Sequence, residues 1–166
     1  MRGFARTEDM FAPTVTVPFT IPLEQGPMPA WLDRLVALGL VGAATVCTWQ
    51  LAGVTPDPRG YDTHVQLGMV PCSWPVLYGI PCPTCGATTA ACLLVHGQPL
   101  HAIYTQPFGA IVAAAGLVAG GFALFCLLWR RSLFDVIARL YWGRITLGAI
   151  ALLLSAWLYK YLMFAA

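Results

Sequence analysis

A long stretch of this chain is almost free of charge. The 95 residues from Leu35 to Trp129 include only three charged ones, Asp57, Arg59 and Asp62. A soluble domain carries about 25% charged residues, whereas the whole chain of 166 residues carries 10% and is 58% hydrophobic. So few charges could not cover the surface of a soluble domain, and a net charge of +2 leaves no basic surface for nucleic acid. The composition therefore predicts an integral membrane protein, and it excludes a soluble enzyme domain, a disordered chain and a nucleic-acid binder.

Three apolar segments are long enough to cross a bilayer, which takes about 20 residues. They run from about 31 to 54, from 108 to 129 and from 145 to 163, and none contains a proline although the chain has 13. We therefore expect an all-α membrane domain with three transmembrane helices over residues 31–166. An extended N-terminal arm over residues 1–30 precedes it.

The arm combines alternating β-branched residues with five prolines between positions 13 and 29, which excludes a helix there. Its apolar residues Val15, Val17, Phe19 and Ile21 favour a strap that lies on a partner protein or on the membrane. A disordered tail is the alternative interpretation, because chain termini are often poorly ordered.

Arginine is distributed unevenly around the predicted spans. Seven arginines lie in the N-terminal flank or in the connection 130–144, whereas Arg59 and Lys160 are the basic residues on the opposite side. Positive residues accumulate in cytoplasmic loops. This bias predicts a cytoplasmic N-terminus and connection, and it places the outer loop (55–107) and the C-terminus outside. The seven are Arg2, Arg6, Arg34, Arg130, Arg131, Arg139 and Arg144.

Two shorter patterns concern the membrane domain. Residues 132–142 begin with a Ser-x-x-Asp cap signature and continue with apolar residues at helical spacing, which predicts a short amphipathic cytoplasmic helix. Gly116 and Gly120 in the second span form a Gly-x-x-x-Gly pattern, which favours close helix packing. No predicted span carries a carboxylate, lysine or arginine at its middle, and this disfavours an ion channel or a charge-coupled transporter.

The outer loop contains the residues that could carry chemistry. Cys72, Cys82 and Cys85 have the spacing C-x9-C-x2-C, and Thr84 can cap a short helix over residues 84–96. A helix of this length cannot span the bilayer, so we expect it to be re-entrant or interfacial. Cys82 then lies just before the helix and Cys85 in its first turn, where backbone N–H groups favour a thiolate.

The run Gly79–Ala90, GIPCPTCGATTA, resembles a family of small bacterial integral membrane proteins of unknown function. The family has an upstream Cys, then T-G-I-x-C-P-x-C-G-x-T-R-A, then a Gly and an Asn-Pro before the next span. This chain departs from the pattern at Tyr78, Thr89 and Gln106, where the family has Thr, Arg and Asn. The resemblance covers about residues 69–130 and implies the fold, the topology and a bacterial inner membrane, but no reaction. The matching positions are Cys72, Gly79, Cys82, Pro83, Cys85, Gly86, Thr88, Ala90, Gly97 and Pro107.

Four interpretations of the cysteines stay open at this point. Cys72 could form a structural disulfide with Cys82 or Cys85, because the outer loop faces an oxidising compartment in the predicted topology. The three thiolates could instead hold a structural zinc ion with His101 or His64 as the fourth ligand. Cys82 and Cys85 could carry out thiol redox catalysis, or the thiols could simply pack in a tight turn.

The predicted function is a non-catalytic accessory, scaffold or assembly subunit of a larger membrane complex. The spans offer no groups that could bind or convert a substrate. The apolar residues of the arm need a partner protein or the membrane to cover them. A membrane thiol–disulfide oxidoreductase using Cys82 and Cys85 is the alternative, followed by a metal-handling membrane protein. The expected partners are the lipid bilayer and other membrane subunits, and zinc is the cofactor considered.

The predicted topology can be tested by labelling single introduced cysteines in intact cells. Labels placed within Thr55–Gln106 should react from outside, whereas labels within Arg130–Arg144 should react only after the membrane is permeabilised. Reaction of Ser132→Cys from outside intact cells contradicts this orientation.

Overall fold

The computed structural model describes residues 29–165, so the predicted arm lies outside the described residues. The described part contains seven α-helices, one 3-10 helix and no strand, and this confirms the all-α expectation. The elements are α1 (Ala30–Ala52), η1 (Thr63–Leu67), α2 (Trp74–Tyr78), α3 (Ala87–Val95), α4 (Pro99–Thr105), α5 (Pro107–Leu128), α6 (Leu133–Ala138) and α7 (Trp142–Ala165).

Three of these helices, α1, α5 and α7, are long and apolar enough to cross a membrane. They confirm the three predicted spans, and α7 begins three residues earlier than expected, at Trp142. The predicted amphipathic helix over residues 132–142 is present as the shorter helix α6, Leu133–Ala138. The Ser132 hydroxyl accepts a hydrogen bond from the Asp135 N–H at 3.3 Å, as the cap signature predicts.

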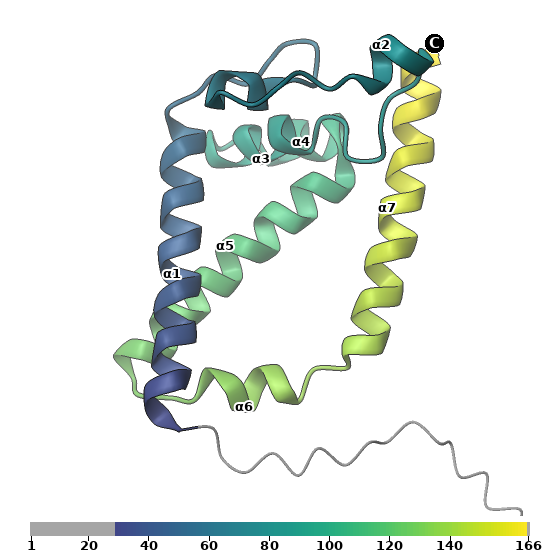
Figure 1. Cartoon of the computed structure of the whole chain (residues 1–166). Helices are drawn as coiled ribbons and strands as arrows, with labels where there is room; N and C mark the ends of the chain where they lie inside the picture. The colour runs from purple at the N-terminus through teal and green to yellow at the C-terminus, as the bar shows by residue number, and fades with distance from the viewer. Residues whose placement is uncertain (1–28, 166) are drawn as a thin grey trace, which may run out of the picture.

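The three long helices do not form a parallel bundle. Helices α1 and α7 run along opposite sides of the molecule, and α5 crosses diagonally between them (Figure 1). Helices α3 and α4 lie across one end, beneath the segment that contains η1 and α2. We call this the cysteine end, and we call the opposite end, where α6 lies, the α6 end.

Helix α5 packs closely on α1 only over part of its length. A Cβ atom on Gly120 would lie 2.5 Å from the Cβ of Ala44, so the two helices can approach this closely only because residue 120 has no side chain. A Cβ on Gly116 would meet nothing within 4 Å. Of the two glycines in the predicted packing pattern, Gly120 therefore lies at the helix contact and Gly116 does not.

The cysteine end contains more structure than the sequence predicted. One short helix was expected in the outer loop, but α3 is followed by α4, and η1 and α2 precede it. Helices α3, α4 and α5 share a small core formed by Ala90, Leu93, Ala102 and Ala110. The three alanines let these helices pack closely. The sequence did not predict α4, η1 and α2 because each is too short to show a helical period of apolar residues.

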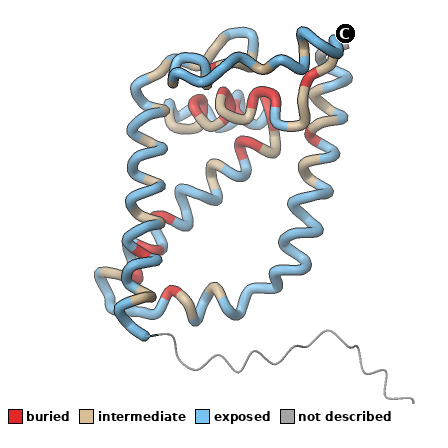
Figure 2. Tube along the Cα trace, in the orientation of Figure 1, coloured by how far each residue is buried: buried red, intermediate tan, exposed pale blue. Residues whose placement is uncertain are grey.

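Helix α7 is exposed along its half nearer the α6 end. Every residue from 142 to 151 is exposed, and burial in α7 is confined to its half nearer the cysteine end, where Ala156 is buried (Figure 2). The buried part of α7 therefore lies near the cysteine end.

Candidate functional site

The cysteine turn, which we define as residues 81–86, is a tight turn that precedes α3. The Cys85 N–H donates to the Cys82 carbonyl at 3.0 Å, and the Ala87 N–H donates to the Thr84 carbonyl at 2.9 Å. Gly86 caps α3 with a φ of +90°, a conformation that favours glycine. A Cβ on Gly86 would also lie 2.5 Å from the Gly60 carbonyl oxygen. Residue 86 must therefore be glycine for both reasons.

This geometry corrects the predicted start of the short helix. The helix begins at Ala87 rather than at Thr84, and no side chain caps it. The Thr84 hydroxyl lies instead 3.7 Å from the Cys82 sulfur. The left-handed backbone at Gly86 separates Cys85 from the helix, so Cys85 does not lie in the first helical turn.

The three loop cysteines surround one cavity. Cys72, Cys82 and Cys85 line a cavity of about 350 Å³ together with Asp62 and His64. Cys85 is buried and only 4% exposed, whereas Cys72 and Cys82 are partly exposed. The structure thus brings four of the predicted site residues together.

His101 is not part of this group. It lines a different cavity, and its Nδ1 atom lies 3.3 Å from Oε1 of Gln98. Of the two histidines considered as a fourth zinc ligand, His64 lies with the cysteines, and its Nε2 atom is 3.1 Å from the Val70 carbonyl oxygen.

Cys85 and Cys72 favour the neutral thiol. The pKa of Cys85 is raised to about 12 chiefly by burial, with smaller contributions from the neighbouring Cys82 and Cys72, and Lys160 opposes this rise. Burial also raises the pKa of Cys72. The expectation that a helix N-terminus favours a thiolate at Cys85 is therefore wrong, because desolvation outweighs any helix dipole at this position.

All six cysteines of the chain carry free thiols. Over residues 29–165, no three side chains of the types His, Cys, Asp and Glu come together as a group that could hold a metal ion. The loop cysteines and His64 therefore line one cavity, but in the described part of the chain they do not form a zinc site. The arrangement offers free thiols in a partly polar pocket.

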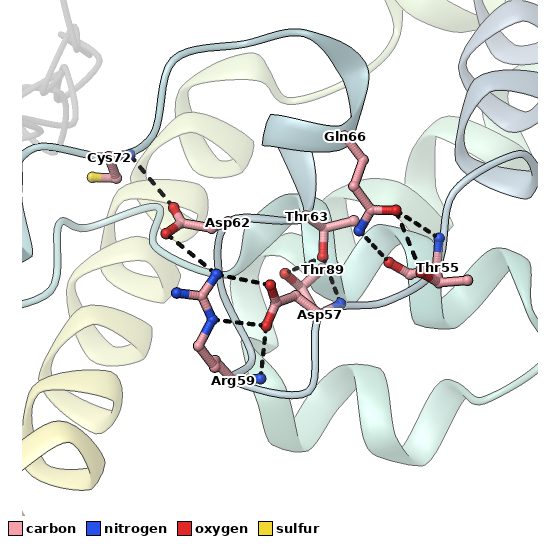
Figure 3. Close-up of polar contacts among 8 residues, drawn as sticks. All are labelled: Thr55, Asp57, Arg59, Asp62, Thr63, Gln66, Cys72 and Thr89. Atoms are coloured by element: carbon pink, nitrogen blue, oxygen red, sulfur yellow. Dashed lines mark hydrogen bonds and ion pairs between the residues drawn. The ribbon is translucent and has the colours of Figure 1, made fainter.

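A polar network covers α3 at the cysteine end (Figure 3). The hydroxyls of Thr63 and Thr89 are both buried and share a hydrogen bond of 2.8 Å. The Thr63 hydroxyl also accepts from the Asp57 N–H at 3.0 Å. Thr89 therefore holds the loop on α3 without a charge. Arg59 is the cation of this network, and it pairs with Asp57 at 2.9 Å and with Asp62 at 3.9 Å.

Side chains of α7 bind the backbone of this region. The Trp157 Nε1–H donates to the Pro81 carbonyl of the cysteine turn at 2.9 Å. The Lys160 ammonium donates to the carbonyls of Gly60 at 3.3 Å and Thr105 at 3.2 Å. These bonds attach the third span to the cysteine turn and to the segments on either side of it. A further bond runs from the Tyr159 hydroxyl to the Tyr104 carbonyl at 2.8 Å.

Gln106 connects the cysteine turn to α5. This fully buried residue precedes α5, and its side-chain oxygen accepts from the Gly109 N–H. Its side-chain nitrogen donates to the Pro83 carbonyl of the cysteine turn at 3.4 Å. One side chain therefore caps a spanning helix and binds the turn.

Sequence reasoning did not identify Trp157, Lys160 and Gln106 as part of the site. Trp157 lies within the third predicted span without a signal of its own, and Lys160 entered only the count of charges used for the topology. The bonds from Trp157 and Lys160 to Pro81 and Gly60 join residues 76 and 100 positions apart. No local sequence pattern indicates contacts of this kind.

The burial of Cys85 predicts a dependence of stability on pH in reducing buffer. A thiol with an ordinary pKa of 9.0 and a folded pKa of about 12 binds its proton more tightly in the folded state. Its contribution to stability is therefore complete below pH 9 and is lost as the pH rises toward 12. The midpoint of thermal unfolding in detergent should fall over this range, and it should fall less steeply in Cys85→Ala. The exposed Cys47→Ala serves as the control, and equal slopes in all three proteins contradict the assignment.

The comparison with known proteins gives a match to one family. The family described as Protein of unknown function (DUF2752) matches residues 72–120. The match runs from Cys72 through the cysteine turn, α3 and α4 to Gly120 in α5, and it leaves out α1 and α7. No curated protein and no solved structure matches the chain. Residues 72–120 are thus similar to a DUF2752 domain, a domain of unknown function.

Proposed function

We propose that this chain is a non-catalytic accessory or scaffold subunit of a larger protein complex in a bacterial inner membrane. The observation that carries the proposal is the exposure of α7 from residue 142 to residue 151. A spanning helix that is exposed at every residue over this length presents most of its surface to its surroundings. In a bilayer, this surface is covered by lipid or by the helices of another protein.

The exposed half of α7 has the composition of a helix-packing surface. Gly143 and Gly148 lie on it, and an added Cβ at either glycine would meet nothing within 4 Å in the described structure. Small residues let helix backbones approach closely in membranes, where packing and hydrogen bonds drive association. This half of α7 is therefore a suitable surface for the helices of a partner subunit.

The cysteine turn supports α7 rather than carrying out a reaction. Its most buried thiol, Cys85, is neutral at physiological pH and therefore a poor nucleophile. The turn is bound to α7 by Trp157 and to α5 by Gln106. In the proposed orientation the turn lies outside the cytoplasm, where Cys72 and Cys82 can form a structural disulfide.

The N-terminal arm extends the proposed association surface on the cytoplasmic side. Its apolar residues Val15, Val17, Phe19 and Ile21 alternate with polar Thr14, Thr16 and Thr20. An extended segment with this alternation presents one apolar face, and binding to a partner can order such a segment.

The association is tested on the full chain extracted from native membranes in mild detergent. We expect the protein to migrate on native gels as part of an assembly well above its own 17.9 kDa. Replacing the four apolar arm residues by Ser should release the chain from the assembly, because the arm loses its apolar contacts. The matched control, Thr→Ser at 14, 16 and 20, should remain bound. A wild-type chain that migrates alone, or equal behaviour of the two variants, contradicts the proposal.

A membrane thiol–disulfide oxidoreductase is the second candidate, and the arrangement of two cavities favours it. An apolar cavity of about 560 Å³ lies between α1, α3 and α5. It shares Met69, Ala87 and Thr88 with the cavity that Cys72, Cys82 and Cys85 line. An apolar electron acceptor of the quinone class could therefore approach the thiols from the membrane.

The Cys85→Ser variant separates the two candidates. If the turn is structural, the variant should accumulate to a lower level in membranes, because a polar hydroxyl replaces a buried thiol in the turn. A variant that accumulates normally but loses an activity of thiol oxidation supports the oxidoreductase instead.

A further inference from the structure

The ammonium of Lys160 has no carboxylate partner among the described residues. Lys160 is the only lysine in the chain and lies near the end of the third span. It is partly buried, and its ammonium donates to the carbonyls of Gly60 and Thr105. The ion pairs of the described residues both belong to Arg59. Charges that are removed from water are usually paired, so this site lacks an anion.

The nearby carboxylates do not supply that anion. Both oxygens of Asp57 bind the Arg59 side chain, at 3.1 Å from Nε and 2.9 Å from a terminal nitrogen. The same guanidinium lies 3.9 Å from Asp62. These contacts lower the pKa of Asp57, so the carboxylate stays ionised and paired with Arg59.

Lys160 also lines a cavity with room for an anion. The cavity has a volume of about 210 Å³ and lies between the loop at residues 56–60, α4 and α7. One water occupies about 30 Å³ in the liquid, so the cavity can hold a hydrated polyatomic anion. Its lining includes the side chains of Lys160, Arg59, His101, Tyr104 and Tyr159, and apolar Met163. The Asp57 carboxylate also lines the cavity, and its charge is paired with Arg59.

The position of the cavity near the end of a helix that is long and apolar enough to span a membrane favours contact with lipid headgroups. The cavity is bounded by the end of a spanning helix, and tyrosines such as Tyr104 and Tyr159 are enriched at the membrane interface. Met163, one helical turn beyond Tyr159, is exposed toward the surroundings of α7. A phospholipid whose phosphate lies at Lys160 would therefore place its acyl chains beside the apolar surface of α7.

We propose that this cavity binds the phosphate of an anionic phospholipid, with the Lys160 ammonium as its principal donor. The phosphate supplies the missing counter-ion, and the acyl chains distinguish a lipid from free phosphate. The Lys160 ammonium also lies close to Gly86 of the cysteine turn, where an added Cβ would be 3.5 Å from it, but the site does not depend on the proposed complex.

The presence of a single lysine allows a direct measurement of binding. The detergent-purified full chain is treated with formaldehyde and borohydride, and methylation of Lys160 is quantified by peptide mass spectrometry. Dioleoylphosphatidylglycerol in mixed micelles should slow methylation about tenfold, the effect of one charge-assisted hydrogen bond. Dioleoylglycerol, which has the same chains without phosphate, and inorganic phosphate should give no protection.

Variants distinguish the charge of Lys160 from its role in holding α7. In native mass spectrometry, Lys160→Arg should retain phosphatidylglycerol, whereas Lys160→Met should bind it about tenfold more weakly. Trp157→Phe loosens α7 but keeps the ammonium, so it should also retain the lipid. Equal binding by wild type and Lys160→Met overturns the proposal, and so does equal loss in Trp157→Phe. Protection by inorganic phosphate alone, or by dioleoylglycerol, overturns the assignment to a phospholipid.

Discussion

Trp157 of α7 and Gln106, the residue that precedes α5, donate hydrogen bonds to backbone carbonyls of the cysteine turn, and the architecture of the cysteine end depends on these bonds. In a bilayer, contact between apolar helices gains little from the hydrophobic effect, because lipid tails are as apolar as the side chains. An unsatisfied carbonyl costs much more there than it does in water. The bonds from Trp157 to Pro81 and from Gln106 to Pro83 therefore fix two spanning helices relative to one turn.

The close approach of the backbone to its neighbours explains why small residues surround this turn. Gly86 lies against the Gly60 carbonyl, and Gly109 at the start of α5 lies against Ala87, where an added Cβ would be 2.5 Å from the Ala87 Cα. Larger side chains at these positions would separate the turn from α5 and move the carbonyls away from their donors. The Gly and Ala residues of the segment thus have a packing role, and the thiols lie within the resulting compact structure.

The sequence predicted the spans well because each is a continuous apolar segment free of proline, and because arginines flank them. It also predicted the cap of α6 at Ser132, which is a local signal. The start of α3 was predicted wrongly because Thr84 is a good cap residue, whereas the left-handed Gly86 decides where the helix begins. The protonation of Cys85 was predicted wrongly because the residue was expected in the first turn of a helix, whereas the folded loop buries its thiol outside the helix. The contacts of Trp157 and Lys160 are equally distant in sequence, so no pattern within the outer loop could reveal them.

The central claim is that α7 is held through the cysteine turn, and the reactivity of Cys85 tests it most directly. The rate at which N-ethylmaleimide modifies Cys85 is measured on the reduced, folded protein in detergent. Trp157→Phe removes the bond to Pro81 and should raise this rate about fivefold, because one hydrogen bond contributes about 1 kcal/mol. Trp142→Phe removes an equivalent indole bond to the Ile137 carbonyl at the α6 end and should leave the rate unchanged. An unchanged rate in Trp157→Phe, or an equal increase in both variants, contradicts the claim.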